Sequence, residues 1–156
     1  MQTYESTIPA VSVRDIMTPR THTLHSDDSL RTAASLFERE HFHHLVILEH
    51  GRVFGVVSDR DILKAISPFV GNPILERFQD VSTLKKRVHQ IMSRKPVTIG
   101  PECSIAAAAE RMLTQRVSCL PVVDDDGSLI GIVTVRDLIA QLAGVPAVET
   151  KCAEEV

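Results

Sequence analysis

The sequence has few aromatic residues and no excess of positive charge, the two features that nucleic-acid-binding proteins commonly use. It contains no tryptophan, and aromatic residues make up only 4% of its 156 positions. Its formal net charge at pH 7 is -3, whereas a nucleic-acid partner usually requires a basic face and often aromatic side chains on which bases stack. We therefore expect no nucleic acid among its partners.

Long apolar runs are also missing. No stretch of 18 apolar residues is present that could span a membrane, and residues 1–5 lack the basic and apolar regions of a signal peptide. Hydrophobic residues make up 44% of the chain and charged residues 24%, a balance typical of a globular protein. These features predict a cytoplasmic protein with no membrane partner.

Cysteines and catalytic signatures are sparse. The chain has three cysteines, an odd number, and no Cys-x-x-Cys spacing. Neither a disulfide framework nor a zinc finger is therefore predicted. We interpret Cys103, Cys119 and Cys152 as small buried or unreactive thiols. No nucleophile elbow, ordered triad or Gly-x-x-x-x-Gly-Lys phosphate loop occurs. We expect no catalytic residues and no enzymatic activity.

What the sequence does contain is an internal duplication. Residues 55–61 read GVVSDRD and residues 131–137 read GIVTVRD. Upstream, the spacing is the same: Val13, Ile16 and Met17 recur 75 positions later as Val88, Ile91 and Met92. Such a consistent register over about 55 residues indicates two copies of one supersecondary unit.

The duplicated motif has two interpretations. A β-branched strand that runs directly into a helix presents free backbone N–H groups and the positive end of the helix dipole, which favour an anion. The hydroxyl of Ser58 or Thr134 could bond a phosphate oxygen, and the carboxylate of Asp61 or Asp137 could accept two ribose hydroxyls. The plainer interpretation is a capping box, with the hydroxyl at the N-cap and the aspartate at the third helical position.

Hydrophobic periodicity predicts the same element order in both copies. An extended piece (21–24 or 97–99) precedes a helix that starts after the N-cap Ser29 or Ser104. Strands follow at 45–48 and 53–57, or at 120–123 and 129–133, each pair joined as a hairpin. A closing helix covers 59–66 or 135–142, with Gly144 as a stop signal. The fold class is therefore α/β (α+β), with tandem β-α-β-β-α repeats packed sheet to sheet around a pseudo-twofold axis.

The same pattern divides the chain. We expect an N-terminal tail at 1–12, repeat one at 13–68, a linker at 69–87, repeat two at 88–144 and a C-terminal tail at 145–156. Val81, Leu84 and Val88 have helical spacing, so the end of the linker is predicted to be a helix that enters repeat two.

These motifs resemble a known family. The stretch Asp15-Ile16-Met17-Thr18, residues 117–124 (VSCLPVVD) and both Gly-x-x-Ser/Thr-x-x-Asp motifs are similar to those of paired cystathionine-β-synthase (CBS) domains, or Bateman modules. The resemblance covers roughly residues 13–143. It implies a stand-alone regulatory module that binds an adenosine-containing ligand such as AMP, ADP or ATP in clefts between the repeats, with no obligatory cofactor. It also implies a homodimer, and an output through an unknown protein partner or through self-association.

The resemblance also implies roles for individual residues. Asp61 and Asp137 would hold ribose hydroxyls. The groups facing phosphates would be Ser58, Thr134, Arg60, Arg136, His43 and His44. The Asp137 cleft would be lined by Met17, His22, His43 and His44, and the Asp61 cleft by Met92, Val97, Ser118 and Cys119. Repeat one has Asp59 where repeat two has Val135. Because like charges repel, we expect the Asp137 cleft to bind phosphates better.

The histidines leave alternatives open. In an extended segment His41 and His43 would share a face, a spacing that can hold a metal, although no carboxylate or cysteine completes a ligand set and we assign no metal site. His43 and His44 otherwise contact phosphate or lie on the surface. At the level of function, the alternatives are a structural dimerisation module without ligand, a metal-binding module using the cluster His41, His43 and His44, and a weak enzyme that turns over nucleotide.

Overall fold

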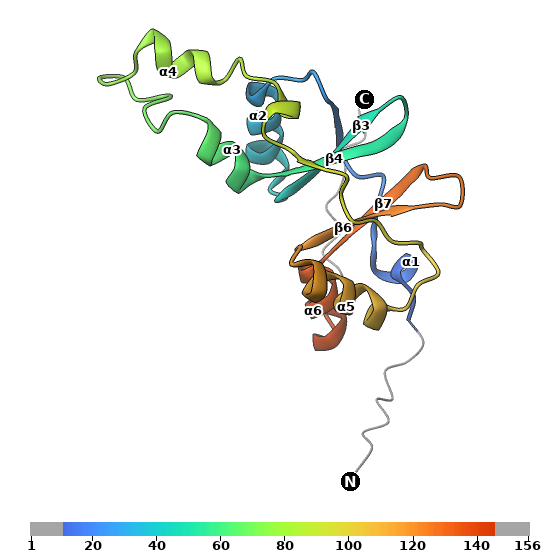
Figure 1. Cartoon of the computed structure of the whole chain (residues 1–156). Helices are drawn as coiled ribbons and strands as arrows, with labels where there is room; N and C mark the ends of the chain where they lie inside the picture. Colours follow the sequence, from blue (N-terminus) through green and yellow to red (C-terminus); the bar gives the residue numbers. More distant parts are fainter. Residues whose placement is uncertain (1–10, 146–156) are drawn as a thin grey trace, which may run out of the picture.

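The computed structural model describes residues 11–145 and consists of two small β-sheets with helices packed on them (Figure 1). Repeat one contains β2 (Thr23–His25), α2 (Leu30–Glu40), β3 (His44–Glu49), β4 (Arg52–Ser58) and α3 (Asp59–Ala65). Repeat two contains α5 (Ile105–Gln115), β6 (Cys119–Val123), β7 (Leu129–Thr134) and α6 (Val135–Ala143). The α/β fold class predicted from the sequence is confirmed. Of the predicted tails, only residues 11, 12 and 145 lie in the described part.

The predicted N-cap serines and the predicted stop glycine lie at the helix ends, as expected. The hydroxyl of Ser29 accepts a hydrogen bond from the N–H of Thr32 at 3.2 Å, and that of Ser104 accepts one from the N–H of Ala107 at 3.1 Å. These N-cap bonds satisfy amides that have no partner within the helix. Gly144 ends α6 in the left-handed conformation at φ +66°, which glycine adopts without strain.

Both predicted hairpins are present. Strand β3 pairs antiparallel with β4, and β6 with β7. The first sheet has the order β2-β3-β4-β5, with β2 parallel to β3, and the second has the order β1-β7-β6. In repeat two the predicted extended piece makes only an isolated parallel bridge, between Ile99 and Val122.

The leading segments of the two repeats are exchanged. The first contains α1 (Val13–Ile16) and β1 (Thr18–Pro19), and β1 pairs with β7 of repeat two. The second contains the 3-10 turn η1 (Val88–Gln90) and β5 (Ser93–Arg94), and β5 pairs with β4 of repeat one. Val13 and Ile16 are buried in the core of repeat two, and Val88 and Met92 in that of repeat one. Each core is therefore completed by the other repeat.

A third apolar cluster joins the two sheets. Val46 of β3, Cys119 of β6 and Ile132 of β7 are buried together. Burial raises the pKa of the Cys119 thiol to about 12, which leaves almost no thiolate near neutral pH. This agrees with the interpretation of Cys119 as a buried, unreactive thiol, whereas Cys152 lies outside the described residues. No helix in the range 11–145 is long and apolar enough to cross a membrane.

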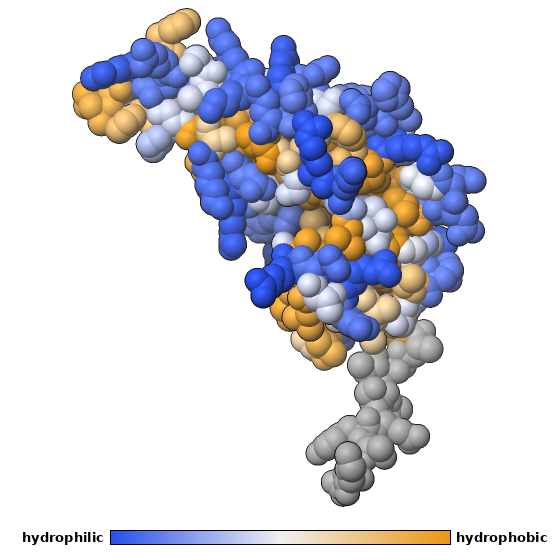
Figure 2. All heavy atoms as spheres, in the orientation of Figure 1, coloured by the Kyte–Doolittle hydropathy of each residue, from blue (hydrophilic) through white to orange (hydrophobic). Residues whose placement is uncertain are grey.

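The predicted helix at the end of the linker is partly wrong. Helix α4 (Phe78–Thr83) ends before Leu84 and does not continue to Val88. The carbonyls of Leu84 and Lys86 accept hydrogen bonds from the N–H groups of Arg31 and Leu30, at 3.1 and 2.9 Å. These first-turn amides of α2 need external acceptors, and the turn that follows α4 at residues 84–86 supplies two of them. The linker projects from the body, and its projecting part carries an apolar patch (Figures 1 and 2). Ile74 and Phe78 are exposed apolar residues of this linker.

Gly131 provides a test of the exchanged packing. A Cβ at this position would lie 2.7 Å from the carbonyl oxygen of Thr18 and 2.9 Å from the Sδ of Met17. We expect Gly131→Ala to lower the free energy of unfolding by about 1–3 kcal/mol, the range for overpacking a close-packed core. Gly100→Ala is the control, because its nearest neighbour would be 3.8 Å away. Urea unfolding measures both, and equal stability of the two variants would contradict the packing.

Candidate functional site

The duplicated motif forms a capping box in both repeats. Thr134 is the N-cap of α6, and its backbone N–H and hydroxyl both donate to Oδ2 of Asp137 at 2.7 Å. Ser58 and Asp61 repeat the arrangement at α3, at 2.9 and 2.7 Å. The plainer interpretation of the motif is thus present in the structure. Because each hydroxyl donates within its own box, it must rotate before it can donate to a phosphate.

The capping boxes use only one carboxylate oxygen. Among the described residues, no hydrogen bond reaches Oδ1 of Asp61 or Asp137. An ionised carboxylate has lone pairs on both oxygens. Each aspartate therefore retains an acceptor for a ligand hydroxyl while it caps its helix.

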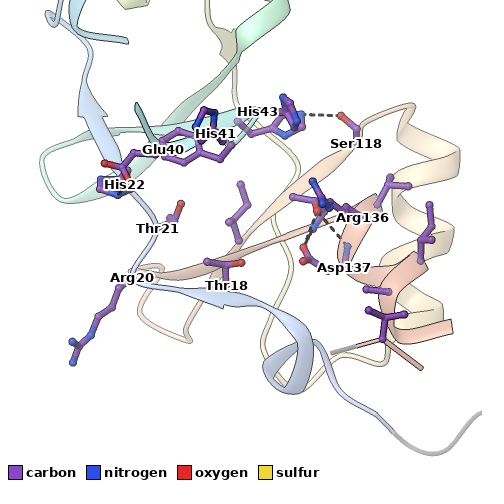
Figure 3. A pocket seen from close by; sticks show the side chains of 18 of the residues that line it. Thr18, Arg20, Thr21, His22, Glu40, His41, His43, Ser118, Arg136 and Asp137 are labelled. Carbon is purple, nitrogen blue, oxygen red and sulfur yellow. Dashed lines mark hydrogen bonds and ion pairs between the residues drawn. The ribbon is translucent and has the colours of Figure 1, made fainter. Parts of the chain in front are cut away.

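Asp137 lies in the larger of two cavities that contain these motifs, with a volume of about 630 Å³. Its walls come from the first leading segment, the end of α2, and the junction of β7 with α6. The polar lining residues are Thr18, Arg20, Thr21, His22, Glu40, His41, His43, His44, Ser118, Thr134, Arg136 and Asp137. The cavity thus brings together three of the four residues predicted for its lining, His22, His43 and His44, with Thr134, Arg136 and Asp137. Figure 3 shows the histidine-bearing segment along one side, with Arg136 and Asp137 across from it.

The Asp61 cavity is smaller, at about 180 Å³. Its lining contains Ser58, Asp61, Val97, Ser118 and Cys119, but Arg60 is not part of it. One cause of the size difference is helix length. Helix α6 has 9 residues and α3 has 7, and the extra length lets Ala143 and Val145 extend the wall of the Asp137 cavity.

The predicted lining roles of Met17 and Met92 are wrong. Neither residue lines the cavity to which it was assigned. Their sulfur atoms instead lie over Gly131 and Gly55, within 2.9 and 2.5 Å of where a Cβ would stand. These glycines leave room for a methionine of the exchanged segment, which therefore turns toward the sheet.

Asp59 is paired with a histidine of the larger cavity. Its Oδ2 lies 2.8 Å from Nδ1 of His43. Burial by itself would raise the pKa of Asp59, but the hydrogen bonds from His43 and from the N–H of Arg60 outweigh it, so this pKa is lowered. The carboxylate that we expected to weaken the Asp61 cleft is thus directed toward His43 and is in the lining of neither cavity.

His44 and Ser118 form a wall shared by the two cavities. Both residues line both cavities, and Nε2 of His44 lies 2.9 Å from Oγ of Ser118. Burial is the largest influence on His44 and lowers its pKa. His43 and Arg60 act in the same direction, against Asp59 and Asp61. His44 therefore acts at neutral pH as an uncharged hydrogen-bonding group.

The extended geometry that we expected for the histidine cluster is wrong. His41 ends α2 in the left-handed conformation at φ 56°, and strand β3 begins only at His44. His41 and His43 therefore do not stand at alternating positions of one strand. Within residues 11–145, no group of three or more His, Cys, Asp or Glu side chains is arranged to hold a metal ion.

Sequence reasoning missed several lining residues. Thr18, Arg20, Thr21 and Glu40 line the larger cavity, and Arg116 lines the smaller one. The repeat offset of 75 aligns Arg20 with Lys95 and His41 with Arg116, but the positive φ values that all four share, between 50° and 56°, cannot be read from the sequence. In Figure 3 the side chain of Arg20 points away from the cavity.

The lowered pKa of His44 predicts a pH-dependent stability. Between the ordinary histidine pKa near 6.5 and the lower folded value, the unfolded chain binds more protons than the folded one, so stability falls with falling pH. We expect wild type to lose more stability than His44→Gln between pH 7.5 and 5.5. Urea unfolding at both pH values measures the difference, and parallel losses would show that His44 titrates normally when folded.

Comparisons with known proteins agree with this architecture. The CBS domain family matches at residues 13–68 and 88–144. The chain is 36% identical over 129 residues to a homoserine O-acetyltransferase of Methanococcoides burtonii, covering 81% of this chain and 23% of that protein. It is 30% identical over 137 residues to an L-aspartate semialdehyde sulfurtransferase of Methanocaldococcus jannaschii, covering 87% and 24%. It thus spans about a quarter of the length of these two relatives. A CBS domain-containing protein of Dictyostelium discoideum is 33% identical, covering 83% and 89%.

Solved structures share the fold. The CBS domain pair of protein MJ0100, in complex with 5′-methylthioadenosine and S-adenosyl-L-methionine, superimposes with a TM-score of 0.72 at 29% identity, covering 87% of this chain and 98% of that one. CBSX2 of Arabidopsis thaliana in complex with AMP gives a TM-score of 0.69 at 29% identity, covering 85% and 96%. Since both repeats match the family and the fold is shared, the chain belongs to the CBS domain family as a tandem pair of CBS domains.

Proposed function

We propose that this CBS pair is a regulatory module that binds an adenosine-containing nucleotide such as AMP, ADP or ATP in the Asp137 cavity. The observation that carries the proposal is the convergence of Asp137, Arg136 and the N-terminus of α6 with a row of histidines around a cavity of about 630 Å³. The AMP bound by CBSX2 and the methylthioadenosine bound by MJ0100 are adenosine derivatives, which supports this ligand class.

In the proposed complex, each group has a chemical task. The open Oδ1 of Asp137 accepts ribose hydroxyls, while its Oδ2 keeps the capping box. The guanidinium of Arg136 and the first amides of α6 face the phosphate, as a bidentate donor and a helix N-terminus respectively. Asp61 and Ser58 would serve a second, smaller site in the same way, without Arg60. His43 and His44 complete the phosphate-facing wall.

The competing functions have less support. A purely structural module has no use for an open acceptor oxygen on an aspartate that lines a large cavity, and the described residues lack a metal-ligand cluster. The enzymes among the relatives match over only about a quarter of their length, so their activities do not transfer to this segment. We propose a cytoplasmic, non-catalytic role, with output through a protein partner or through self-association.

We also propose that the module forms homodimers. Leu63 on α3 and Ile139 on α6 are equivalent positions in the two repeats, and their side chains are 69% and 59% exposed. One chain therefore carries a pseudo-symmetric pair of apolar side chains, on α3 and α6, that the described residues leave exposed. A second copy presents the same pair, so a twofold arrangement can bury them all.

The ribose role of Asp137 has a matched control within the chain. Asp15 caps α1 with the same capping-box geometry, accepting from the N–H and hydroxyl of Ser12 at 2.8 Å, but it lines neither cavity. Asp137→Ala should weaken AMP binding about 10- to 150-fold, equivalent to about 1.5–3 kcal/mol for charge-assisted hydrogen bonds. Asp15→Ala should bind like wild type. Calorimetric titration with AMP tests both, and wild-type affinity in Asp137→Ala would refute the site.

The dimer makes a separate prediction. Ile139→Glu places a charge in the proposed interface, where burying it unpaired is unfavourable, and should shift the protein from dimer to monomer. Ile74→Glu is the control, since Ile74 is 88% exposed on the projecting linker. Light scattering after size-exclusion chromatography gives the mass of each variant. A dimer that persists in Ile139→Glu would exclude this face.

A further inference from the structure

Histidines are concentrated in one place. The chain has seven, and four of them line the Asp137 cavity: His22, His41, His43 and His44. The other ionisable groups in the lining are Arg20, Glu40, Arg136 and Asp137. With neutral imidazoles, the formal charges of these two arginines and two carboxylates cancel, although the Arg20 side chain points away from the cavity. Each imidazole that takes up a proton makes the lining positive by one charge.

The contacts of these histidines allow a charged state. His43 bonds the carboxylate of Asp59 at 2.8 Å, and this contact persists when the ring is protonated. Nε2 of His22 lies 3.9 Å from Oε2 of Glu40, and its ring stacks on Phe42 at 5.4 Å. His41 is exposed at the end of α2. His44 differs, because burial, Arg60 and His43 oppose its protonation while Asp59 and Asp61 favour it.

The Asp61 cavity has a different composition. Its ionisable lining residues are His44, Asp61, Arg116 and the buried thiol of Cys119. Its one positive group of fixed charge is an arginine, which does not titrate near neutral pH. At the positions equivalent to His41 and His43, repeat two has Arg116 and Ser118. The Asp61 cavity thus contains a single imidazole, that of His44, whose protonation burial opposes, whereas three further histidines line the larger cavity.

We propose that the Asp137 cavity selects its adenosine ligand by charge in a proton-dependent way, favouring anionic phosphate esters over uncharged adenosine derivatives increasingly as pH falls from 8 to 6. This inference rests on the proposed nucleotide function and adds the regulation of that site. Histidine is the side chain whose ordinary pKa lies in this range. A ligand that binds better to the protonated cavity must promote proton uptake when it binds, by thermodynamic linkage.

The test needs ligands whose own charge stays constant. The phosphate of AMP titrates near pH 6, so adenosine 5′-sulfate serves as the anionic probe and 5′-methylthioadenosine as the uncharged one. Calorimetric titrations at pH 8 and pH 6 should give an affinity for the sulfate that rises about tenfold or more, while that for methylthioadenosine changes less than about threefold. Titrations at pH 7 in two buffers of different ionisation enthalpy should show proton uptake with the sulfate only.

Histidine variants test whether the rise in sulfate affinity at low pH comes from the histidines of the Asp137 cavity. His41→Gln/His43→Gln removes two exposed imidazoles of the cavity and should reduce the rise in sulfate affinity to about threefold or less. His25→Gln alters an exposed histidine of β2 outside both cavities and should retain the full rise. Parallel pH dependence for the two ligands, or a full rise in the double variant, would overturn the inference while leaving nucleotide binding intact. Failure of every adenosine ligand to bind at either pH would instead refute the proposed function, and this inference with it.

Discussion

The exchange of leading segments between the repeats is the constraint on which the rest of the structure depends. Strand β1 lies so close to β7 that the carbonyl of Thr18 and the sulfur of Met17 occupy the space above Gly131. The same arrangement joins β5, Met92 and Gly55 in the other half. Because Val13 and Val88 each fill the core of the opposite repeat, neither repeat has a complete core of its own. The pair is therefore one cooperative unit.

The exchange also places the cavities at the boundary between the repeats. The leading segment that crosses to β7 carries Thr18 to His22 past the start of α6, where the capping box holds Asp137. His44 and Ser118, one from each repeat, then meet between the two cavities. A ligand in the larger cavity thus contacts both repeats at once. Its binding energy can differ between two arrangements of the pair, which is what a regulatory module requires.

Features set by neighbouring residues could be predicted from the sequence. Ser29, Ser104 and Gly144 act within one turn of a helix, and the hairpins join strands that are adjacent in the chain, so local pattern was sufficient for them. The grouping of His22, His43 and His44 with Asp137 was predicted from the family resemblance. What failed depended on contacts between distant segments. The linker helix ends at Thr83 and the turn after it bonds the first amides of α2, while Met17 and Met92 turn toward glycines of the opposite repeat. The left-handed turn at His41 also has no simple signal in composition or periodicity.

The central claim is that the Asp137 cavity holds an adenosine nucleotide. A crystal structure of the chain grown with excess AMP tests it most directly, because it locates the ligand independently of any variant. The account predicts the nucleotide between the histidine-bearing segment and α6, with a ribose hydroxyl within hydrogen-bond distance of Oδ1 of Asp137 and the phosphate beside Arg136. A nucleotide bound elsewhere, or none in this cavity at saturating AMP, would contradict it.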